Sequence, residues 1–186
     1  MLQRTHDLAA VALVSYRFLS QPVPLTWETL LGIGVATLLG SAVPDIDNVS
    51  SPAWRHKLTP WEGRATRQFL EGHRNLSHSI IGVVLFWFIL RLLLHLINLP
   101  HLDAGAVVTA FVWAQLSHLL TDSLTEQGVP WLYPIPIRMG FPPIKPMRIK
   151  TGKWFEKLVI FPTLLIVTIV IYYVYRKSLP IILNRI

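Results

Sequence analysis

The sequence predicts an all-α, polytopic helical membrane protein of about five helices, and three observations favour this fold class. Hydrophobic residues make up 52% of the 186 residues, and the mean hydropathy is +0.47, above a typical soluble composition. Four apolar stretches, 29–43, 79–99, 104–120 and 158–175, approach the roughly 20 residues that cross the hydrocarbon core of a bilayer. Clusters of proline and glycine separate these stretches.

Apolar length and chain breakers place the expected helices. Their ranges are 5–19, 26–43, 77–98, 104–125 and 155–176. No small-residue cleavage site follows the apolar run at 8–16, so we expect a retained helix there and not a removed signal peptide. The chain shows no internal repeat, and we expect residues 1–186 to form a single membrane-embedded domain.

Two long connections, 44–76 and 126–154, are expected to be functional loops. If all five helices cross, both loops and the N-terminus lie on one side of the membrane. Twelve of the seventeen Lys and Arg residues then share that side, which the positive-inside bias makes cytoplasmic. We therefore expect a multi-pass membrane protein whose two long loops face the cytoplasm.

Charge and cysteine content restrict the possible chemistry. The chain has no cysteine, so any metal must bind through His, Asp or Glu. The net charge of +7 comes from cations in loops between apolar helices, and this placement favours anionic lipid headgroups or a phosphate-bearing substrate over nucleic acid.

Residues able to bind metal or move protons fall on one side of the predicted bundle. They are His6, Asp45, Asp47, His73, His78, His118 and Asp122. His118 and Asp122 are spaced i, i+4 and share a helix face, while Asp45 and Asp47, at i, i+2, can face one way in an extended or turn segment. Imidazole and carboxylate ligands suit a divalent ion, zinc first and Mn or Mg as alternatives. Seven candidates allow one ion, or two ions that share a bridging carboxylate.

Each of these residues also has an ordinary structural interpretation. Any of them could contact lipid headgroups at a helix end, "PDIDN" could be a simple turn, and His6 could belong to a helix cap. This interpretation is weakest for His118 and Asp122, because ionisable groups within an apolar helix are costly. Ser77 is expected to cap the third helix and not to act as a nucleophile.

Several motifs together resemble those of a known family. They are Thr5-His6, "LLGSAVPDIDN", "HRNLSHS" and "HLLTDSLTEQGVPWLYP", which cover the chain to about residue 136. In this pattern the chain is similar to a family of bacterial inner-membrane metal-dependent hydrolases that includes a LexA-regulated member. That family has a distant similarity to zinc-dependent phospholipase C and P1-type nucleases. Asn75 and Ser77 replace a Gly and a Thr of the family pattern.

The resemblance implies a hydrolase that cleaves a phosphoester in a lipid or lipid-linked substrate by metal-activated water. Asp45 or Asp47 would accept the proton of the water, and Arg55 and Arg74 would neutralise phosphate oxygens. The alternative is an ion or metal transporter that uses the same cluster. Transporters place such residues near the bilayer midplane and between repeats, whereas here they gather at one face and no repeat is present.

Overall fold

The computed structural model describes residues 1–47, 76–135 and 137–184, and within these ranges the chain is helical and without strands. The predicted site residues Arg55, His73 and Arg74 lie outside the described residues. The backbone of Asp47 is described as the end of a 3₁₀ turn, Val43–Asp47, but its side chain lies outside the described part.

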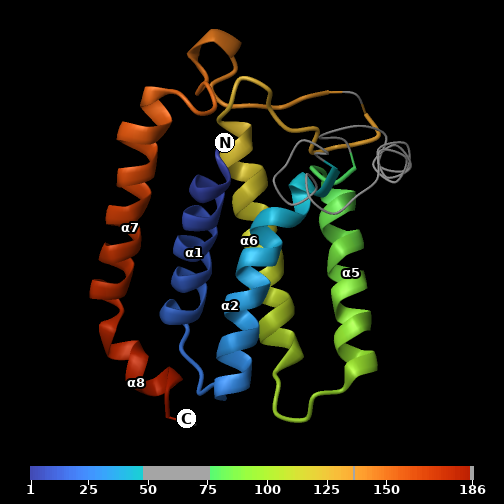
Figure 1. Cartoon of the computed structure of the whole chain (residues 1–186), viewed down its shortest axis with the longest axis vertical. Coiled ribbons are helices and arrows are strands. Elements are labelled where there is room, and N and C mark those ends of the chain that lie inside the picture. Colours follow the sequence, from blue (N-terminus) through green and yellow to red (C-terminus); the bar gives the residue numbers. More distant parts are fainter. Residues whose placement is uncertain (48–75, 136, 185–186) are drawn as a thin grey trace, which may run out of the picture.

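The six α-helices of the described residues confirm the predicted fold class (Figure 1). They are α1 (Gln3–Ser20), α2 (Trp27–Ala42), α5 (Ile80–Ile97), α6 (Ala104–Ser123), α7 (Phe161–Val174) and α8 (Leu179–Ile182). Each of the five predicted ranges overlaps one long helix, with α1 extending beyond its predicted range 5–19 at both ends, and the short α8 was not predicted.

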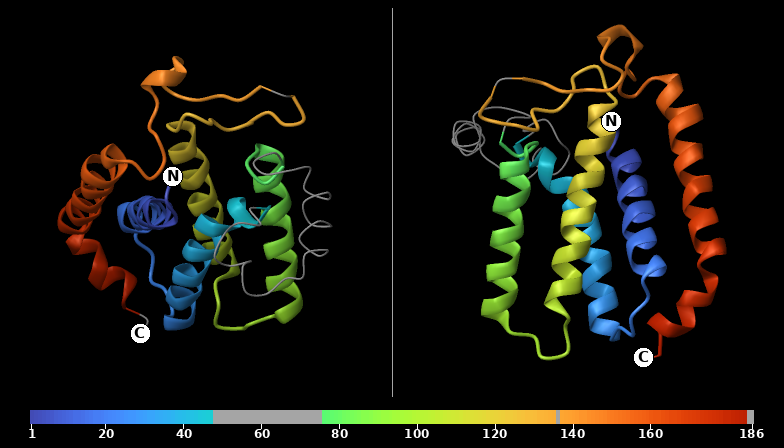
Figure 2. Two further views of the ribbon diagram at one scale, coloured as in Figure 1. Left: turned by 45° about the horizontal axis from the view of Figure 1, so that its top comes forward. Right: turned by 180° about the vertical axis from the view of Figure 1, so that it is seen from behind.

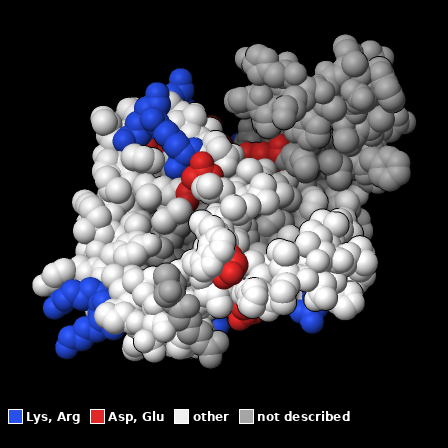
Figure 3. Space-filling view, turned by 60° about the horizontal axis from the view of Figure 1, so that its bottom comes forward, with Lys and Arg blue, Asp and Glu red and all other residues white. Residues whose placement is uncertain are grey.

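Within the described residues, four segments are long and apolar enough to cross a membrane. They are Trp27–Asp45, Ile80–Ile97, Ala104–Ser123 and Glu156–Val174. Large apolar side chains cover their outer surfaces, as on α5, where Phe88 is 57% exposed and Leu96 is 70% exposed. Most of the described surface presented in Figure 3 is uncharged, and its Lys and Arg side chains form separate groups. Outward-facing apolar helices of this length are expected in a lipid bilayer, where lipid replaces water as the solvent.

The central helix of the described bundle is α6, which packs against α1, α2 and α5, while α7 packs against α1 (Figure 2). Helices α2 and α6 approach each other closely at Gly40. A Cβ atom added there would lie 2.5 Å from the carbonyl oxygen of Phe111 and 2.8 Å from the Cβ of Ala114. Small residues allow helix backbones to approach closely in membranes, so Gly40 sets the distance between α2 and α6.

The start of α5 differs from the prediction. Helix α5 begins at Ile80, and its cap is Ser79, whose hydroxyl accepts a hydrogen bond from the Gly82 amide at 3.1 Å. Ser77 is buried before the helix, with its hydroxyl 3.1 Å from Nδ1 of His78. The expected cap at Ser77 was therefore wrong by two residues, because the chain turns back over the first turn of the helix. A Cβ atom at Gly82 would lie 2.2 Å from the carbonyl oxygen of Leu76.

A buried glutamate joins the beginning of α1 to the segment that precedes α7. Glu156 opens a π-helical turn, Glu156–Ile160, that leads directly into α7. Its Oε1 accepts hydrogen bonds from the Leu2 amide at 2.7 Å and the Thr5 hydroxyl at 2.8 Å, and its Oε2 accepts one from the Gly152 amide at 2.7 Å. Amides at the start of a helix lack helical partners, and a carboxylate is favourable there. Glu156 thereby holds the first turn of α1 in place.

Candidate metal centre

Four elements bring ionisable side chains together at the end of the bundle where the N-terminus lies (Figure 1). His6 is in the first turns of α1, and His118 and Asp122 are in the last turns of α6. Asp45 follows α2 in the 3₁₀ turn, and His78 directly precedes the cap of α5. The predicted convergence of these five residues on one end is present in the structure.

His118 is completely buried on the face of α6 that packs against α2. Its Nδ1 lies 2.7 Å from the backbone carbonyl oxygen of Ser41, the residue after Gly40. A carbonyl can only accept, so Nδ1 carries the proton and Nε2 has a free lone pair. Metal-binding histidines are commonly oriented in this way by a hydrogen bond to the other ring nitrogen.

His6 is also completely buried, and its tautomer follows from Thr121. The Thr121 hydroxyl lies 2.9 Å from the carbonyl oxygens of Ser117 and His118, to which it donates its one hydrogen. The same hydroxyl is 2.8 Å from His6 Nδ1, so it accepts a hydrogen bond from that nitrogen. Nε2 of His6 is then the nitrogen with the lone pair, and it faces Asp122.

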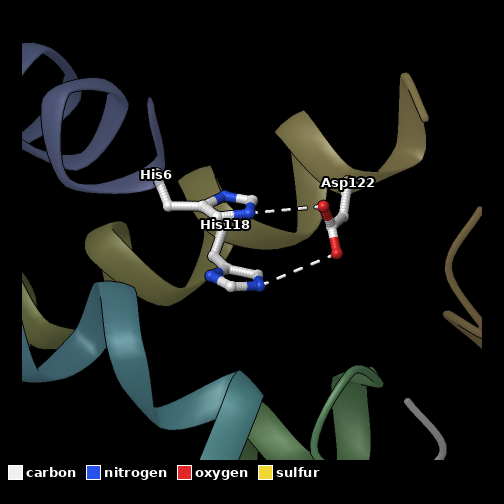
Figure 4. Close-up of side chains that lie close together, drawn as sticks. All are labelled: His6, His118 and Asp122. Carbon is white, nitrogen blue, oxygen red and sulfur yellow. Dashed lines mark ion pairs between the residues drawn. The ribbon is translucent and has the colours of Figure 1, made fainter. Parts of the chain in front are cut away.

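The three imidazole rings pack against one another. The rings of His6 and His118 are stacked, with centroids 3.7 Å apart and planes at 11°, and the ring of His78 meets that of His118 edge-on at 5.2 Å. Figure 4 shows the stacked pair, with Nε2 of both rings directed at the carboxylate of Asp122. This packing directs imidazole nitrogens from three separate elements toward one region.

Asp122 connects the imidazole groups through its two oxygens. Oδ1 lies 3.3 Å from Nε2 of His6 and 2.5 Å from the amino group of Met1. Oδ2 lies 3.7 Å from Nε2 of His78 and 3.8 Å from Nε2 of His118. One buried carboxylate therefore contacts all three histidines.

Asp45 lies near two of these histidines, His78 and His118. Its Oδ1 lies 3.6 Å from Nε2 of His78, and its Oδ2 lies 3.9 Å from Nε2 of His118. The Asp45 side chain is 20% exposed, whereas those of Asp122 and the three histidines are 0% exposed. Asp45 is thus the member of the cluster that solvent reaches.

The distances within this cluster fit a divalent ion. Ligand atoms about 2.1 Å from a tetrahedral centre are about 3.4 Å apart, and the nitrogen–oxygen separations among Asp45, His78, His118 and Asp122 are 3.6–3.9 Å. Two overlapping triads meet the geometric requirement, and both contain His118: His6 with His118 and Asp122, and Asp45 with His78 and His118. The Nε2 atoms of His6 and His118 and Oδ1 of Asp45 form no hydrogen bond with any described residue. The donor set and its oriented lone pairs therefore suit a metal.

Sequence reasoning did not identify the groups that orient these ligands. Ser41 acts through its backbone carbonyl, which no side-chain pattern reveals. Thr121 lies three residues after His118, a spacing that could have indicated a shared helix face. Glu156 is distant in sequence from Thr5, and nothing in its local sequence indicated their contact.

For four of the predicted site residues, the side chain or the whole residue lies outside the described part of the chain. The side chain of Asp47 and the whole of Arg55, His73 and Arg74 lie outside that part of the chain. Their proposed roles as ligands or phosphate-binding groups remain predictions.

Comparison with known proteins places the chain among membrane proteins. The model of a family described as YdjM inner membrane protein matches residues 1–179. The Bacillus subtilis (strain 168) protein YvsG, described as uncharacterized, is 29% identical over 122 residues, which are 66% of this chain and 67% of YvsG. No solved structure matches this chain. The chemistry of the protein must therefore be inferred from the site itself.

Proposed function

The chain belongs to the YdjM inner membrane protein family, and we propose that its buried cluster is the metal centre of a membrane-embedded hydrolase that cleaves a phosphoester in a lipid or lipid-linked substrate. The observation that carries this proposal is the convergence of three imidazole nitrogens and two carboxylates, with separations of 3.3–3.9 Å between the paired groups. Zinc is the ion we expect, because it favours nitrogen and oxygen ligands at tetrahedral spacing.

We propose that His78, His118 and Asp122 hold one ion, since Asp122 Oδ2 lies 3.7 Å and 3.8 Å from Nε2 of the two histidines. The fourth position of a tetrahedral site would then stay open for water beside Asp45, whose oxygens lie 3.6 Å and 3.9 Å from the same nitrogens. His118 offers only Nε2, because Ser41 occupies its Nδ1, and one imidazole nitrogen binds one ion. A second ion beside His6 would therefore be bridged by Asp122, whose Oδ1 faces His6 while its Oδ2 faces the other two histidines. Such bridged pairs occur in phosphoesterases.

The exposures of the two carboxylates support different roles for them. A bound divalent ion supplies Lewis-acid polarisation of a phosphoryl oxygen and a water that ionises near neutral pH. Asp122 is fully buried and suits a permanent ligand, whereas Asp45 is 20% exposed and suits the group that accepts a proton from incoming water. Arg55 and Arg74 remain the proposed clamps for phosphate oxygens.

The position of the cluster supports a lipid substrate over a transported ion. The cluster lies at the ends of α2, α5 and α6, beside the connection from α6 to α7 that carries Arg138, Lys145, Arg148, Lys150 and Lys153. We expect lipid headgroups at the ends of membrane-spanning helices, whereas coupling sites of transporters lie near the bilayer midplane. We propose that the cluster faces the cytoplasm, in accordance with the positive-inside bias.

Metal analysis of the purified protein tests this proposal. We expect at least one zinc per chain, and a loss of bound zinc in the double variant Asp122→Ala, His78→Ala. A matched double variant, His101→Ala with Glu126→Ala, removes the same kinds of side chain at exposed or half-exposed positions and should keep its zinc. Equal metal content in the two double variants would rule out the metal centre.

A hydrolysis screen then separates the enzyme from the transporter. The zinc-loaded protein should cleave phospholipids or soluble phosphodiesters, and the Asp122→Ala, His78→Ala variant should lose this activity. A protein that binds zinc and is inactive across the screen, but carries ions across liposome membranes, would instead support the transporter.

A further inference from the structure

Gln115 of α6 is a buried amide that the proposed metal centre does not use. Its side chain is completely buried, and neither Oε1 nor Nε2 forms a hydrogen bond with any described residue. An amide offers two donor hydrogens and two acceptor lone pairs, and leaving them unpaired in an apolar interior is unfavourable. Such a group in a native structure requires an explanation.

Other polar side chains of α6 are satisfied within their own helix. Thr109 donates to the carbonyl oxygen of Gly105 at 2.8 Å, Ser117 to that of Ala114 at 2.8 Å, and Thr121 to that of Ser117 at 2.9 Å. These local bonds are what serine and threonine typically form within a helix. Gln115 has no equivalent bond, so its amide remains available to a partner from outside α6.

The position of Gln115 relates it to the metal centre. Gln115, His118 and Asp122 are spaced i, i+3, i+7 and therefore share one stripe of α6. By helical rise, Gln115 lies about 4.5 Å from the level of His118, in the direction of the bundle interior, because α6 ends at the site (Figure 2). It is thus the next polar residue inward from the metal ligands on their own stripe.

The residues about one helical turn before and after Gln115, Phe111 and Leu119, show which helices it faces. The Phe111 backbone contacts α2 at Gly40, and Leu119 packs against Val83 of α5. Gln115 therefore lies on the surface of α6 between α2 and α5. These two helices pack on α6 and contact each other little within the described residues, so few contacts between them would have to break for a ligand group to reach Gln115.

We propose that Gln115 is a substrate-binding residue that hydrogen-bonds a neutral oxygen group, an ester carbonyl or a hydroxyl, of a lipid whose phosphate lies at the metal centre. This inference rests on the proposed function and specifies its substrate class. Anionic groups are bound best by charged donors, whereas a neutral amide suits a neutral polar group. In a phospholipid the glycerol ester oxygens lie between the phosphate and the acyl chains, and Gln115 lies on the corresponding inner side of the metal ligands.

The thermal unfolding midpoint of the zinc-loaded protein in detergent tests this proposal without any need for activity. Two probes are compared: dioleoylphosphatidylglycerol, which carries ester carbonyls and hydroxyls, and dodecyl phosphate, which carries neither. We expect the phospholipid to raise the midpoint of the native protein more than dodecyl phosphate does.

The variant Gln115→Met removes the amide and keeps a similar shape. We expect this variant to bind zinc normally and, in the absence of lipid, to have a higher unfolding midpoint than the native protein. It should lose most of the extra midpoint shift produced by the phospholipid and keep the shift produced by dodecyl phosphate. Gln127→Met, at an exposed loop position, is the matched control and should match the native protein throughout.

Three results would overturn the inference. The first is a lower midpoint of Gln115→Met without lipid, which would indicate a structural partner. The second is an unchanged extra shift of the midpoint with the phospholipid. The third is an equal loss of both shifts, which would indicate that Gln115 orders water at the centre and does not contact the lipid. A native protein that binds no zinc would instead contradict the metal centre, whatever the lipid shifts show. The zinc content therefore distinguishes failure of the proposed function from failure of this inference.

Discussion

At the scale of single residues, the orientation of two of the three imidazoles depends on a partner outside the His/Asp cluster. The Ser41 carbonyl determines which nitrogen of His118 carries the proton, and the Thr121 hydroxyl does the same for His6. Such outer partners of a metal ligand typically contribute a tenfold to hundredfold factor in metal affinity. The two partners are therefore as informative to test as the ligands themselves.

Replacing Thr121 with valine should weaken zinc binding by roughly tenfold to hundredfold, because the hydroxyl that holds Nδ1 of His6 is lost while the shape of the side chain is kept. Competition with a zinc-binding dye measures this affinity. Thr109→Val is the matched control, since Thr109 bonds to the Gly105 carbonyl on the same helix, away from the cluster. Equal affinities for the two variants would contradict a ligand role for His6.

At the scale of helices, two contacts between elements set the geometry of the site. One is the close approach of α2 and α6 at Gly40, next to the carbonyl that orients His118. The other is Glu156, which ties the first turn of α1 to the beginning of α7 next to His6. Each contact joins residues far apart in the chain, so each affects both the stability of the fold and the position of a ligand.

A Gly40→Ala substitution should lower both the thermal midpoint and the zinc content. The added Cβ would lie 2.5 Å from the Phe111 carbonyl oxygen, so α2 and α6 must separate and carry Ser41 away from His118. Gly34→Ala is the matched control, because a Cβ there meets nothing within 4 Å. This control should be neutral or stabilise the protein by about 0.5–1 kcal/mol through helix propensity. A Gly40→Ala variant as stable as Gly34→Ala would contradict the close packing.

A Glu156→Gln substitution should destabilise the protein by roughly 1.5–3 kcal/mol, the contribution of a hydrogen bond to a charged group. An amide has one acceptor oxygen, so it cannot accept from the Leu2 amide and the Thr5 hydroxyl on one side and from the Gly152 amide on the other. Denaturation in mixed micelles measures the change. Glu126→Gln, in a half-exposed ion pair with Lys150 at 4.0 Å, should change stability by less than about 1 kcal/mol.

At the scale of the whole molecule, the His/Asp cluster and the loop that connects α6 to α7 lie at one end of the bundle, and the connection from α5 to α6 lies at the other (Figure 1). This arrangement requires the two connections to face opposite sides of the membrane. The cysteine-free chain makes the arrangement directly testable.

Single cysteines at Lys145 and His101, both exposed, should react with a membrane-impermeant maleimide from opposite sides. We expect Lys145→Cys to be labelled only after the inner membrane is opened and His101→Cys to be labelled in intact spheroplasts. The reverse pattern would place the cluster on the outer face and contradict the cytoplasmic assignment.

Zinc binding by the whole protein should decrease as the pH falls. Metal binds the neutral form of histidine, and protons compete for the same nitrogen. Zinc should therefore be retained at neutral and mildly alkaline pH and be released through the range in which histidine is protonated. Dialysis at a series of pH values, followed by metal analysis, gives the profile. A zinc content independent of pH down to the carboxylate range would contradict histidine ligands.

The sequence by itself determined the fold class, the long helices and the end of the bundle at which His6, Asp45, His78, His118 and Asp122 meet. The length of the apolar stretches and the alternation of helix ends between the two sides of the membrane suffice for this, because each crossing helix reverses the direction of the chain. The i, i+4 spacing of His118 and Asp122 is likewise a local property of one helix.

Only the tertiary structure decided which atoms face one another. The cap at Ser79, the Ser41 carbonyl on His118, the contacts of Glu156 and the buried amide of Gln115 all depend on how helices distant in sequence pack. A close approach such as that at Gly40 arises from the fit of two surfaces. Hydrophobic periodicity specifies which face of a helix is buried, but it does not specify which neighbour covers that face.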